Sequence, residues 1–271
     1  MSQSKIKTSN NITYVFDLDG VVYRGKELQP YARETLTNLT KLGHNIFYFT
    51  NNAAKSRDTY VQKLNSLNIE ANINQIMTSA YATALYFIEN GHSGKKVYQI
   101  GEAGLKKELE EVGMQVFTDA IDNIDDIDFV VIGLDRKFNY EKMKYAHLAI
   151  MNGAKFIATN RDTTFPIENG VTVPGGGCMV AAVETSTNVK PLVIGKPEIY
   201  AYNKILEITN TKPENSIMVG DRLDTDILVG NRAGAQTVLV LTGITSKDEA
   251  LKAKGDSIPD RIIDNLGELI Q

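Results

Sequence analysis

The sequence has little of several residue types that mark other classes of protein. It contains a single cysteine, Cys178, so neither an intrachain disulfide nor a cysteine-based metal site can form. Its 29 Lys and Arg residues are outnumbered by 33 Asp and Glu residues, which gives a formal net charge of -4. Nucleic acids and anionic membranes are bound chiefly through an excess of basic residues, so we expect neither as a main partner.

Long apolar runs are also missing from the 271 residues. No stretch approaches the roughly 18 to 20 apolar residues of a membrane-spanning helix. The polar N-terminal segment, residues 1–11, lacks the apolar core of a signal peptide. We therefore expect a soluble protein in a reducing, cytoplasmic compartment.

Short apolar runs alternate with segments of helical period along most of the chain. Residues 12–16 are typical of a buried strand, a helix with Leu36, Leu39 and Leu42 on one face ends at Gly43, and a second strand follows at 45–50. Further strands are predicted at 75–78, 96–100, 128–132, 155–158, 192–194, 216–219 and 236–241. Helices are predicted at 56–67, 81–90, 102–111, 140–151 and from the glycine run at 175–177 to about 185. This alternation predicts an α/β fold with a parallel sheet between layers of helices.

The number of strand-helix units exceeds what one open sheet usually contains, and periodicity alone does not locate a domain boundary. The acidic stretch 119–128 is interpreted as a solvated connection, because it lacks the spacing of a calcium-binding loop. The glycine run 175–177 is interpreted as a hinge, and Cys178 beside it as a small packed residue.

Four polar clusters each follow a predicted strand, where ligands bind in open parallel sheets. The clusters are residues 17–20 (DLDG), 50–52 (TNN), 195–197 (GKP) and 220–226 (GDRLDTD). In the first cluster, Asp17 and Asp19 can approach one site while Leu18 points away. Two carboxylates held close together repel each other, so a cation should bind between them, and Mg²⁺ is favoured by oxygen ligands.

Each cluster taken alone also has an ordinary structural explanation: a solvated turn, a helix cap or a surface lysine. Their order along the chain points instead to a nucleophile, phosphate anchors and metal ligands. In this order the motifs resemble those of the haloacid dehalogenase (HAD) superfamily. The stretches FTNNAAKSR, VPGGG and GDRLDTDILVGNRAGAQTVLVLTG are similar to the NagD and 4-nitrophenylphosphatase branch, and the likeness covers nearly the whole chain.

The resemblance implies a Rossmann-like parallel-sheet core formed by residues 1–79 and 178–271. A smaller α/β cap domain is then inserted at residues 80–177 and selects the substrate. This division also accounts for the excess of strand-helix units. A homodimer formed through the cap would be in keeping with the family.

The resemblance further implies a magnesium-dependent phosphatase with an aspartyl-phosphate intermediate. Asp17 is then the nucleophile and Asp19 the general acid and base. Mg²⁺ is held by the side chains of Asp17 and Asp221 and by the main-chain carbonyl of Asp19. The substrate is a small phosphorylated metabolite such as a sugar phosphate, a nucleoside monophosphate or phosphoglycolate, with 4-nitrophenyl phosphate as an artificial substrate.

The other motif residues receive supporting roles from the same resemblance. Thr50 donates a hydrogen bond to the phosphoryl group and Lys196 balances its charge. Asn51 and Asn52 hold the same loop or touch the phosphate. Asp226 is favoured over Asp224 as the residue that orients metal-bound water.

Two cap loops, residues 133–136 and 160–166, follow predicted strands and are candidates for substrate selection, with Leu134 and Phe165 as supporting residues. Phe165 either stacks on a substrate ring or packs inside the cap, and packing is favoured. Relatives that act on pyridoxal phosphate carry His-Pro in place of Phe165-Pro166, so that substrate is disfavoured.

Three other functions remain open from the sequence. A receiver domain also accepts phosphate on an aspartate, but this chain is more than twice the roughly 120 residues of such domains. A phosphometabolite-binding protein without turnover is the second. A phosphotransferase or dehalogenase is the third, although the family's dehalogenases generally lack the second aspartate, which is Asp19 in this chain.

Overall fold

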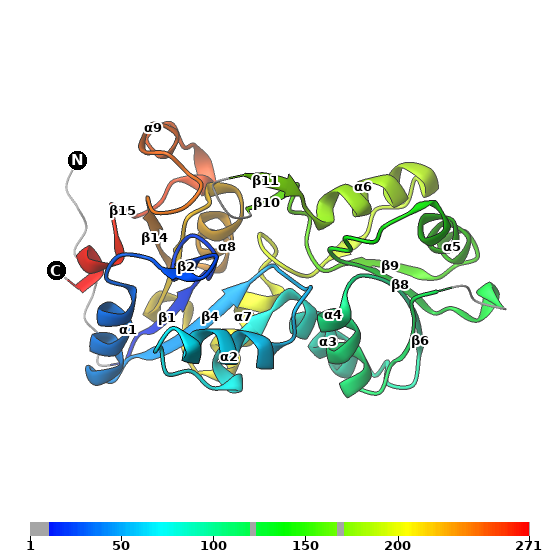
Figure 1. Cartoon of the computed structure of the whole chain (residues 1–271), viewed down its shortest axis with the longest axis horizontal. Helices are drawn as coiled ribbons and strands as arrows, with labels where there is room; N and C mark the ends of the chain where they lie inside the picture. The colour runs from blue at the N-terminus through cyan, green and yellow to red at the C-terminus, as the bar shows by residue number, and fades with distance from the viewer. Residues whose placement is uncertain (1–10, 120–122, 167–170, 271) are drawn as a thin grey trace. The chain divides into compact units, whose positions relative to one another are not determined.

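The computed structural model describes residues 11–119, 123–166 and 171–270 (Figure 1). It divides into two compact units. The first unit contains Met1–Thr50, Tyr60–Met77 and Lys196–Gln271, and the second contains Asn51–Thr59 and Thr78–Gly195. Within the described ranges, no helix combines the length and apolar character that crossing a bilayer requires.

The first unit is built on a six-stranded parallel sheet. Its central strand, β1 (Thr13–Phe16), pairs with β4 (Asn45–Thr50) on one side and with β13 (Ser216–Gly220) on the other. The full order is β15-β14-β13-β1-β4-β5, with β5 at Ile76–Thr78, β14 at Gln236–Val240 and β15 at Arg261–Ile263. The chain leaves β1 toward one edge of the sheet and returns later on the other side. Open α/β sheets bind ligands at such a switch point.

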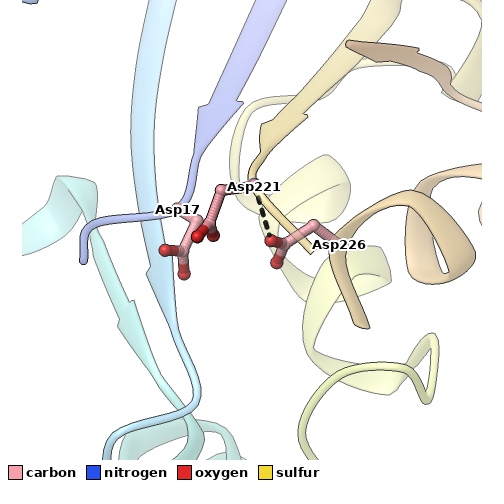
Figure 2. A group of neighbouring side chains, drawn as sticks. All are labelled: Asp17, Asp221 and Asp226. Atoms are coloured by element: carbon pink, nitrogen blue, oxygen red, sulfur yellow. Dashed lines mark hydrogen bonds between the residues drawn. The ribbon is translucent and has the colours of Figure 1, made fainter. Parts of the chain in front are cut away.

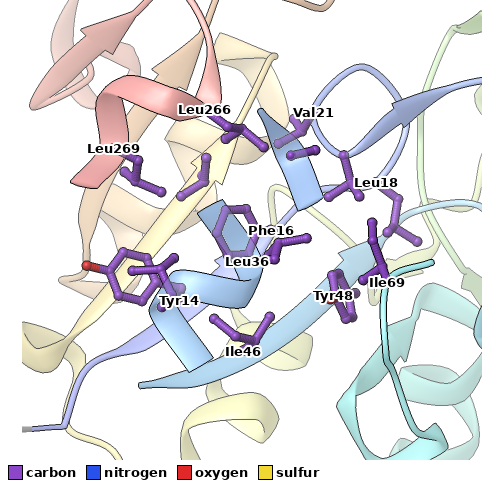
Figure 3. Close-up of a cluster of buried hydrophobic side chains, with 14 of the residues drawn as sticks. Tyr14, Phe16, Leu18, Val21, Leu36, Ile46, Tyr48, Ile69, Leu266 and Leu269 are labelled. Carbon is purple, nitrogen blue, oxygen red and sulfur yellow. The ribbon is translucent and has the colours of Figure 1, made fainter. Parts of the chain in front are cut away.

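Helices cover both faces of this sheet. On one face, a cluster of buried apolar side chains joins the strands to α1 (Ala32–Lys41), α2 (Arg57–Ser66) and the short helix η7 (Leu266–Ile270) (Figure 3). On the other face lie α7 (Tyr200–Ile208) and α8 (Leu228–Ala233), and the Tyr202 hydroxyl of α7 donates to Ser216 Oγ of β13 at 3.1 Å. Each large side chain that becomes fully buried contributes about 1.5–3 kcal/mol, so this packing holds the strand ends in fixed positions.

The second unit contains a five-stranded parallel sheet with the order β12-β9-β8-β6-β7. The strands span Lys96–Ile100 (β6), Gln115–Phe117 (β7), Phe129–Ile132 (β8), Lys155–Ala158 (β9) and Leu192–Val193 (β12). Helices α5 (Tyr140–Met151) and α6 (Gly176–Thr187) pack in one apolar cluster with the sheet. Helices α3 (Ser79–Glu89) and α4 (Ala103–Glu111) contact each other, and the ring of Phe87 on α3 lies 4.8 Å from that of Phe129 on β8.

The predicted α/β class with parallel sheets is confirmed. The predicted strands at 45–50, 96–100 and 155–158 and the helix at 140–151 occur with the expected bounds. Elements too short to show a period were missed, namely β7, β15, α9 (Lys247–Ala250), the hairpin of β2 (Tyr23–Arg24) with β3 (Glu27–Leu28) and the hairpin of β10 (Thr164–Pro166) with β11 (Thr172–Pro174). Helices α7 and α8 were also missed, although the buried residues Ala201, Tyr202, Ile205 and Leu206 of α7 follow helical spacing.

The structure differs from the expected division at its second boundary, which was placed at residue 177. Helix α6 packs on α5, and β12 pairs in parallel with β9, so the second unit extends to Gly195. The structure also differs from the expected division in that residues 51–59, which were expected in the core, group with the second unit.

The glycine run is not a hinge between units but the start of α6. A Cβ on Gly177 would lie 2.4 Å from the carbonyl oxygen of Arg161, and one on Gly175 would lie 2.2 Å from that of Asp162. The glycines therefore allow the first turn of α6 to approach the loop after β9.

The acidic stretch 119–128 is a connection held by ordinary polar contacts, as predicted, apart from residues 120–122, which lie outside the described residues. Asp128 accepts hydrogen bonds from the backbone of Lys96 at 2.8 Å and from Lys95 Nζ at 2.9 Å.

Candidate active site

Three neighbouring parallel strands place the central groups of the site. Asp17 follows β1, Thr50 is the last residue of β4, and Asp221 follows β13. The backbone N–H of Asp17 donates to the carbonyl of Val219 at 2.9 Å, which continues the pairing of β1 with β13 to the edge of the sheet. Because the carboxyl ends of all three strands meet at one edge, their polar side chains converge there.

Lys196 lies at the centre of this edge with its side chain 2% exposed. Its Nζ is 2.7 Å from Asp17 Oδ1, 2.7 Å from Asp226 Oδ1 and 3.1 Å from the carbonyl oxygen of Phe49. Burial lowers the pKa of the Lys196 ammonium, but the carboxylates of Asp17 and Asp226 outweigh burial and raise this pKa above its ordinary value. Lys196 therefore remains a cation that binds both carboxylates.

Three buried carboxylates form a potential cation site. Asp17, Asp221 and Asp226 each offer an oxygen, and these oxygens lie within 4.8 Å of one another (Figure 2). Burial raises the pKa of Asp17 well above its ordinary value, partly offset by Lys196. Burial and the charge of Asp226 raise the pKa of Asp221 to about 7. One ammonium does not balance three carboxylates, so the group favours a further cation.

Asp226 and Asp224 differ sharply in their surroundings. Asp226 is 1% exposed; its Oδ1 accepts from Lys196 and its Oδ2 accepts from the backbone N–H groups of Asp221 and Arg222, both at 3.1 Å. The side chain of Asp224 is 69% exposed and pairs with Arg222 at 2.9 Å. Asp226 thus orients the loop that carries Asp221, whereas Asp224 lies at the surface.

Two glycines are needed for the position of Asp221. A Cβ on Gly243 would lie 1.8 Å from Asp221 Oδ2, and one on Gly20 would lie 2.5 Å from the same atom. Gly20 also has a φ of 97°, which glycine adopts without strain. The backbone N–H of Ile244 then donates to Asp221 Oδ2 at 2.8 Å. Gly243 was not among the predicted site residues, although it ends the stretch that resembles the family.

Thr50 and Asp19 lie in the first unit beside buried tyrosines. Thr50 is 4% exposed, and its side chain is hydrogen-bonded to the Tyr60 hydroxyl. Asp19 is half-buried and forms an isolated parallel bridge with Tyr23. Burial raises the pKa of Tyr60 above its ordinary range, and the negative charges of Asp19 and Asp17 add to this effect. The charge of Asp19 therefore lies near the Thr50–Tyr60 pair.

Asn51 and Asn52 belong to the second unit and hold loops there. The side-chain amide of Asn51 donates to Asp162 Oδ1 at 3.0 Å, and its main-chain carbonyl accepts from Asn160 Nδ2 at 2.8 Å. Asn52 Oδ1 accepts from the backbone N–H of Ala54 at 2.9 Å. Asn51 and Asn52 were expected either to hold the loop or to touch the phosphate, and these contacts are of the first kind.

The two residues expected to support substrate selection pack in the apolar cluster of the second unit. Leu134 is 6% exposed within this cluster, and Phe165 is partly buried against it. The partly buried position of Phe165 agrees with the favoured interpretation, in which its ring packs inside the cap.

Comparison with known proteins places this chain in a family. Models of the haloacid dehalogenase-like hydrolases match residues 14–115 and 193–269. An acid sugar phosphatase of Staphylococcus saprophyticus is 39% identical over 90% of this chain and 91% of its own length. A p-nitrophenyl phosphatase from Archaeoglobus fulgidus is 31% identical, with a TM-score of 0.87 over 97% of this chain and 99% of that one.

A third relative, the glycerol phosphate phosphatase of Mycobacterium tuberculosis, was solved in complex with magnesium. It is 32% identical, with a TM-score of 0.86 over 96% of this chain and 76% of that one. The resemblance inferred from the motifs is thereby confirmed. The chain belongs to the haloacid dehalogenase-like hydrolases and is a phosphatase of that family.

Proposed function

We propose that this phosphatase uses Mg²⁺ and the Asp17 carboxylate to hydrolyse a phosphate monoester of a small metabolite. The observation that carries the proposal is the buried contact of Lys196 with Asp17 beside Asp221, at the ends of three adjacent parallel strands. A nucleophilic carboxylate, a fixed cation and a second carboxylate for a metal are the parts that phosphoryl transfer requires.

The residues at this edge fit magnesium. The side chains of Asp17 and Asp221 and the main-chain carbonyl of Asp19 would hold the ion, and all of these ligands are oxygens, as Mg²⁺ prefers. Burial raises the pKa values of Asp17 and Asp221, and the charge of Asp226 adds to both shifts, so a cation bound between these carboxylates would favour their ionised forms. When bound, Mg²⁺ neutralises charge on the phosphoryl oxygens. The magnesium complex of the glycerol phosphate phosphatase supports the same choice of ion.

Two displacements complete the proposed reaction. A carboxylate oxygen of Asp17 forms a bond to phosphorus while the bond from phosphorus to the ester oxygen breaks, and Asp19 gives its proton to the departing oxygen. Asp19, now ionised, then takes a proton from a water molecule as that water attacks phosphorus. The bond between Asp17 and phosphorus breaks, inorganic phosphate leaves and the Asp17 carboxylate is restored.

Thr50 and Lys196 stabilise the phosphoryl group during both steps. The Thr50 hydroxyl donates a hydrogen bond to a phosphoryl oxygen, and the Lys196 ammonium balances the negative charge that Asp17 and the phosphoryl group share. Lys196 is well suited to this task because its contacts with Asp17 and Asp226 already fix its position. Asn51 is proposed to act on the loop after Thr50, through its bond to Asp162.

The relatives point to small organic phosphates as substrates. Their names include a sugar phosphatase, a glycerol phosphate phosphatase and a p-nitrophenyl phosphatase. We propose the same class, phosphate monoesters of small polyols and sugars, for this chain.

The test is phosphate release from glycerol phosphate and 4-nitrophenyl phosphate, with Mg²⁺ and with EDTA. We expect EDTA to abolish release, and Asp17→Asn to lower kcat by at least about 10³-fold, because an amide oxygen is a poor nucleophile. Asp224→Asn is the matched control, since its carboxylate lies at the surface. Undiminished release by Asp17→Asn would exclude the proposed nucleophile.

A further inference from the structure

Tyr60 is buried beside the candidate site and has no part in the reaction described above. It lies on α2 with 2% of its surface exposed, within the same apolar cluster as Tyr48 of β4. Its hydroxyl forms a hydrogen bond with the side chain of Thr50. Most buried phenols are hydrogen-bonded, and the partner of Tyr60 is the residue that is proposed to bind the phosphoryl group.

The alternation of β4 explains why these two hydroxyls meet. Ile46 and Tyr48 belong to the apolar cluster that includes Tyr60. Because successive side chains of a strand point to opposite faces, Thr50 lies on the same face as Ile46 and Tyr48. Phe49 points to the other face, where its ring centroid lies 4.8 Å from Lys196 Nζ. Thr50 thus approaches the phosphoryl position from the α2 side, and Lys196 from the opposite face.

Tyr60 is held firmly in this position. Leu64, one turn later on α2, is fully buried in the same cluster. Lys63, which is also on α2, places its Nζ 3.2 Å from the centroid of the Tyr23 ring. This cation–π contact holds α2 against β2. The phenol therefore cannot turn away from Thr50 without disturbing the packing of α2 on the sheet.

A threonine hydroxyl has one proton and can both donate and accept. If the Tyr60 hydroxyl donates to Thr50 Oγ1, the single Thr50 proton is left to point toward another acceptor. We propose that Tyr60 is a positioning residue that directs the Thr50 proton toward the transferring phosphoryl group. This inference rests on the proposed function, since it assigns the orientation of a phosphate ligand in the same site.

The phenol of Tyr60 carries the proton that this hydrogen bond needs. Burial and then the charge of Asp19 raise the pKa of the phenol above its ordinary value, and the hydrogen bond with Thr50 offsets only part of this rise. Tyr60 therefore keeps its proton across the working pH range and is able to donate it to Thr50 Oγ1. A phenolate at the same place would accept the Thr50 proton and remove it from the phosphoryl group.

The decisive comparison is Tyr60→Phe against Tyr202→Phe. Both substitutions remove one buried hydroxyl from a helix that packs on the same sheet, and Tyr202 bonds Ser216 rather than a site residue. Each should lower the midpoint of urea unfolding by a similar small amount, so both variants fold. We expect Tyr60→Phe to lower kcat for phosphate release about tenfold with KM within twofold, and Tyr202→Phe to leave both constants within twofold.

A double-mutant cycle with Thr50→Val shows whether Tyr60 acts through Thr50. We expect Tyr60→Phe to have no further effect on kcat once the Thr50 hydroxyl is gone. The loss in Tyr60→Phe should also be equal for 4-nitrophenyl phosphate and glycerol phosphate. Their leaving groups differ greatly in their need for a proton, whereas the phosphoryl group is the same.

Three results would overturn the inference. The first is an equal kcat for Tyr60→Phe and Tyr202→Phe, and the second is additivity with Thr50→Val. The third is a loss confined to glycerol phosphate, which would mean that Tyr60 acts on proton donation by Asp19. Failure of the proposed function is recognised separately, because Asp17→Asn would then retain activity while these comparisons could still be made.

Discussion

Asp221 makes the stability of the metal-free protein depend on pH. Burial, followed by the charge of Asp226, raises its pKa from 3.8 to about 7. The folded state therefore binds this proton more tightly than the unfolded state does. The contribution to the free energy of unfolding is greatest below about pH 4, falls as the pH rises toward 7 and is constant above that. A shift of roughly three units at about 1.4 kcal/mol per unit sets an upper limit of about 4 kcal/mol.

Asp221→Asn isolates this effect, because the amide is neutral at every pH and its oxygen can still accept from Ile244. Other carboxylates change the stability of both proteins alike, so the difference between the variant and the wild type is the quantity to follow. In EDTA, we expect the variant to gain up to about 4 kcal/mol relative to the wild type between pH 4 and pH 7. Urea unfolding at pH 4, 5, 6, 7 and 8 measures it.

The control is Asp224→Asn, whose side chain is 69% exposed and whose difference from the wild type should stay flat with pH. In EDTA the contribution of Asp221 to the free energy of unfolding of the wild type falls as the pH rises. Mg²⁺ should oppose this fall, since it binds the ionised carboxylates and stabilises the folded state more at pH 8 than at pH 5. A difference between Asp221→Asn and the wild type that did not change with pH would refute the reasoning.

Three further outcomes are expected. Lys196→Met leaves Asp17 and Asp226 without their shared cation, so urea unfolding at pH 7 in EDTA should show a loss of about 3–5 kcal/mol; a loss below 1 kcal/mol would contradict the buried ion pairs. Asp226→Asn should lower kcat for phosphate release at least tenfold, because Asp226 is hydrogen-bonded to Lys196 and to the loop that carries Asp221. Asp224→Asn should leave kcat unchanged. Equal effects of the two substitutions would contradict the different roles of these two aspartates. Tyr23→Phe should change stability by less than about 0.5 kcal/mol, because the buried Tyr23 hydroxyl has no hydrogen-bond partner among the described residues; a loss as large as that of Tyr202→Phe would show an overlooked partner.

The strands were the most predictable part of the fold. Strands such as 45–50 and 96–100 are buried on both faces of a parallel sheet, so they occur as short runs of mainly apolar and aromatic residues that stand out from the polar helices around them. The order of strands in each sheet does not follow from such runs. Strand β12 is an example: nothing in the sequence of its two residues indicates that they pair with β9 in the second unit.

The candidate site was predictable where polar residues directly follow a buried strand. Asp17, Thr50 and Asp221 are recognisable in that way, and the structure brings them to one edge of the sheet. Tyr60 was not recognisable, because a tyrosine four residues before Leu64 on a helix has the spacing of an ordinary core residue. Its hydroxyl contact depends on how α2 packs against β4, and no local pattern carries that information.

The charges at the site suggest that cation and phosphate binding depend on each other. Asp17, Asp221 and Asp226 carry three negative charges when ionised, and Lys196 supplies one positive charge. The remaining excess of negative charge repels a phosphate ester, and in a buried site this repulsion is screened much less than at the surface. A divalent cation would bring the sum to zero, so that Lys196 and the Thr50 hydroxyl could attract the ester. Because such coupling is reciprocal, the ester should in turn strengthen binding of the cation. On the proposed mechanism Lys196 would have two tasks: it limits the repulsion among the carboxylates and would bind the phosphoryl group of the ester.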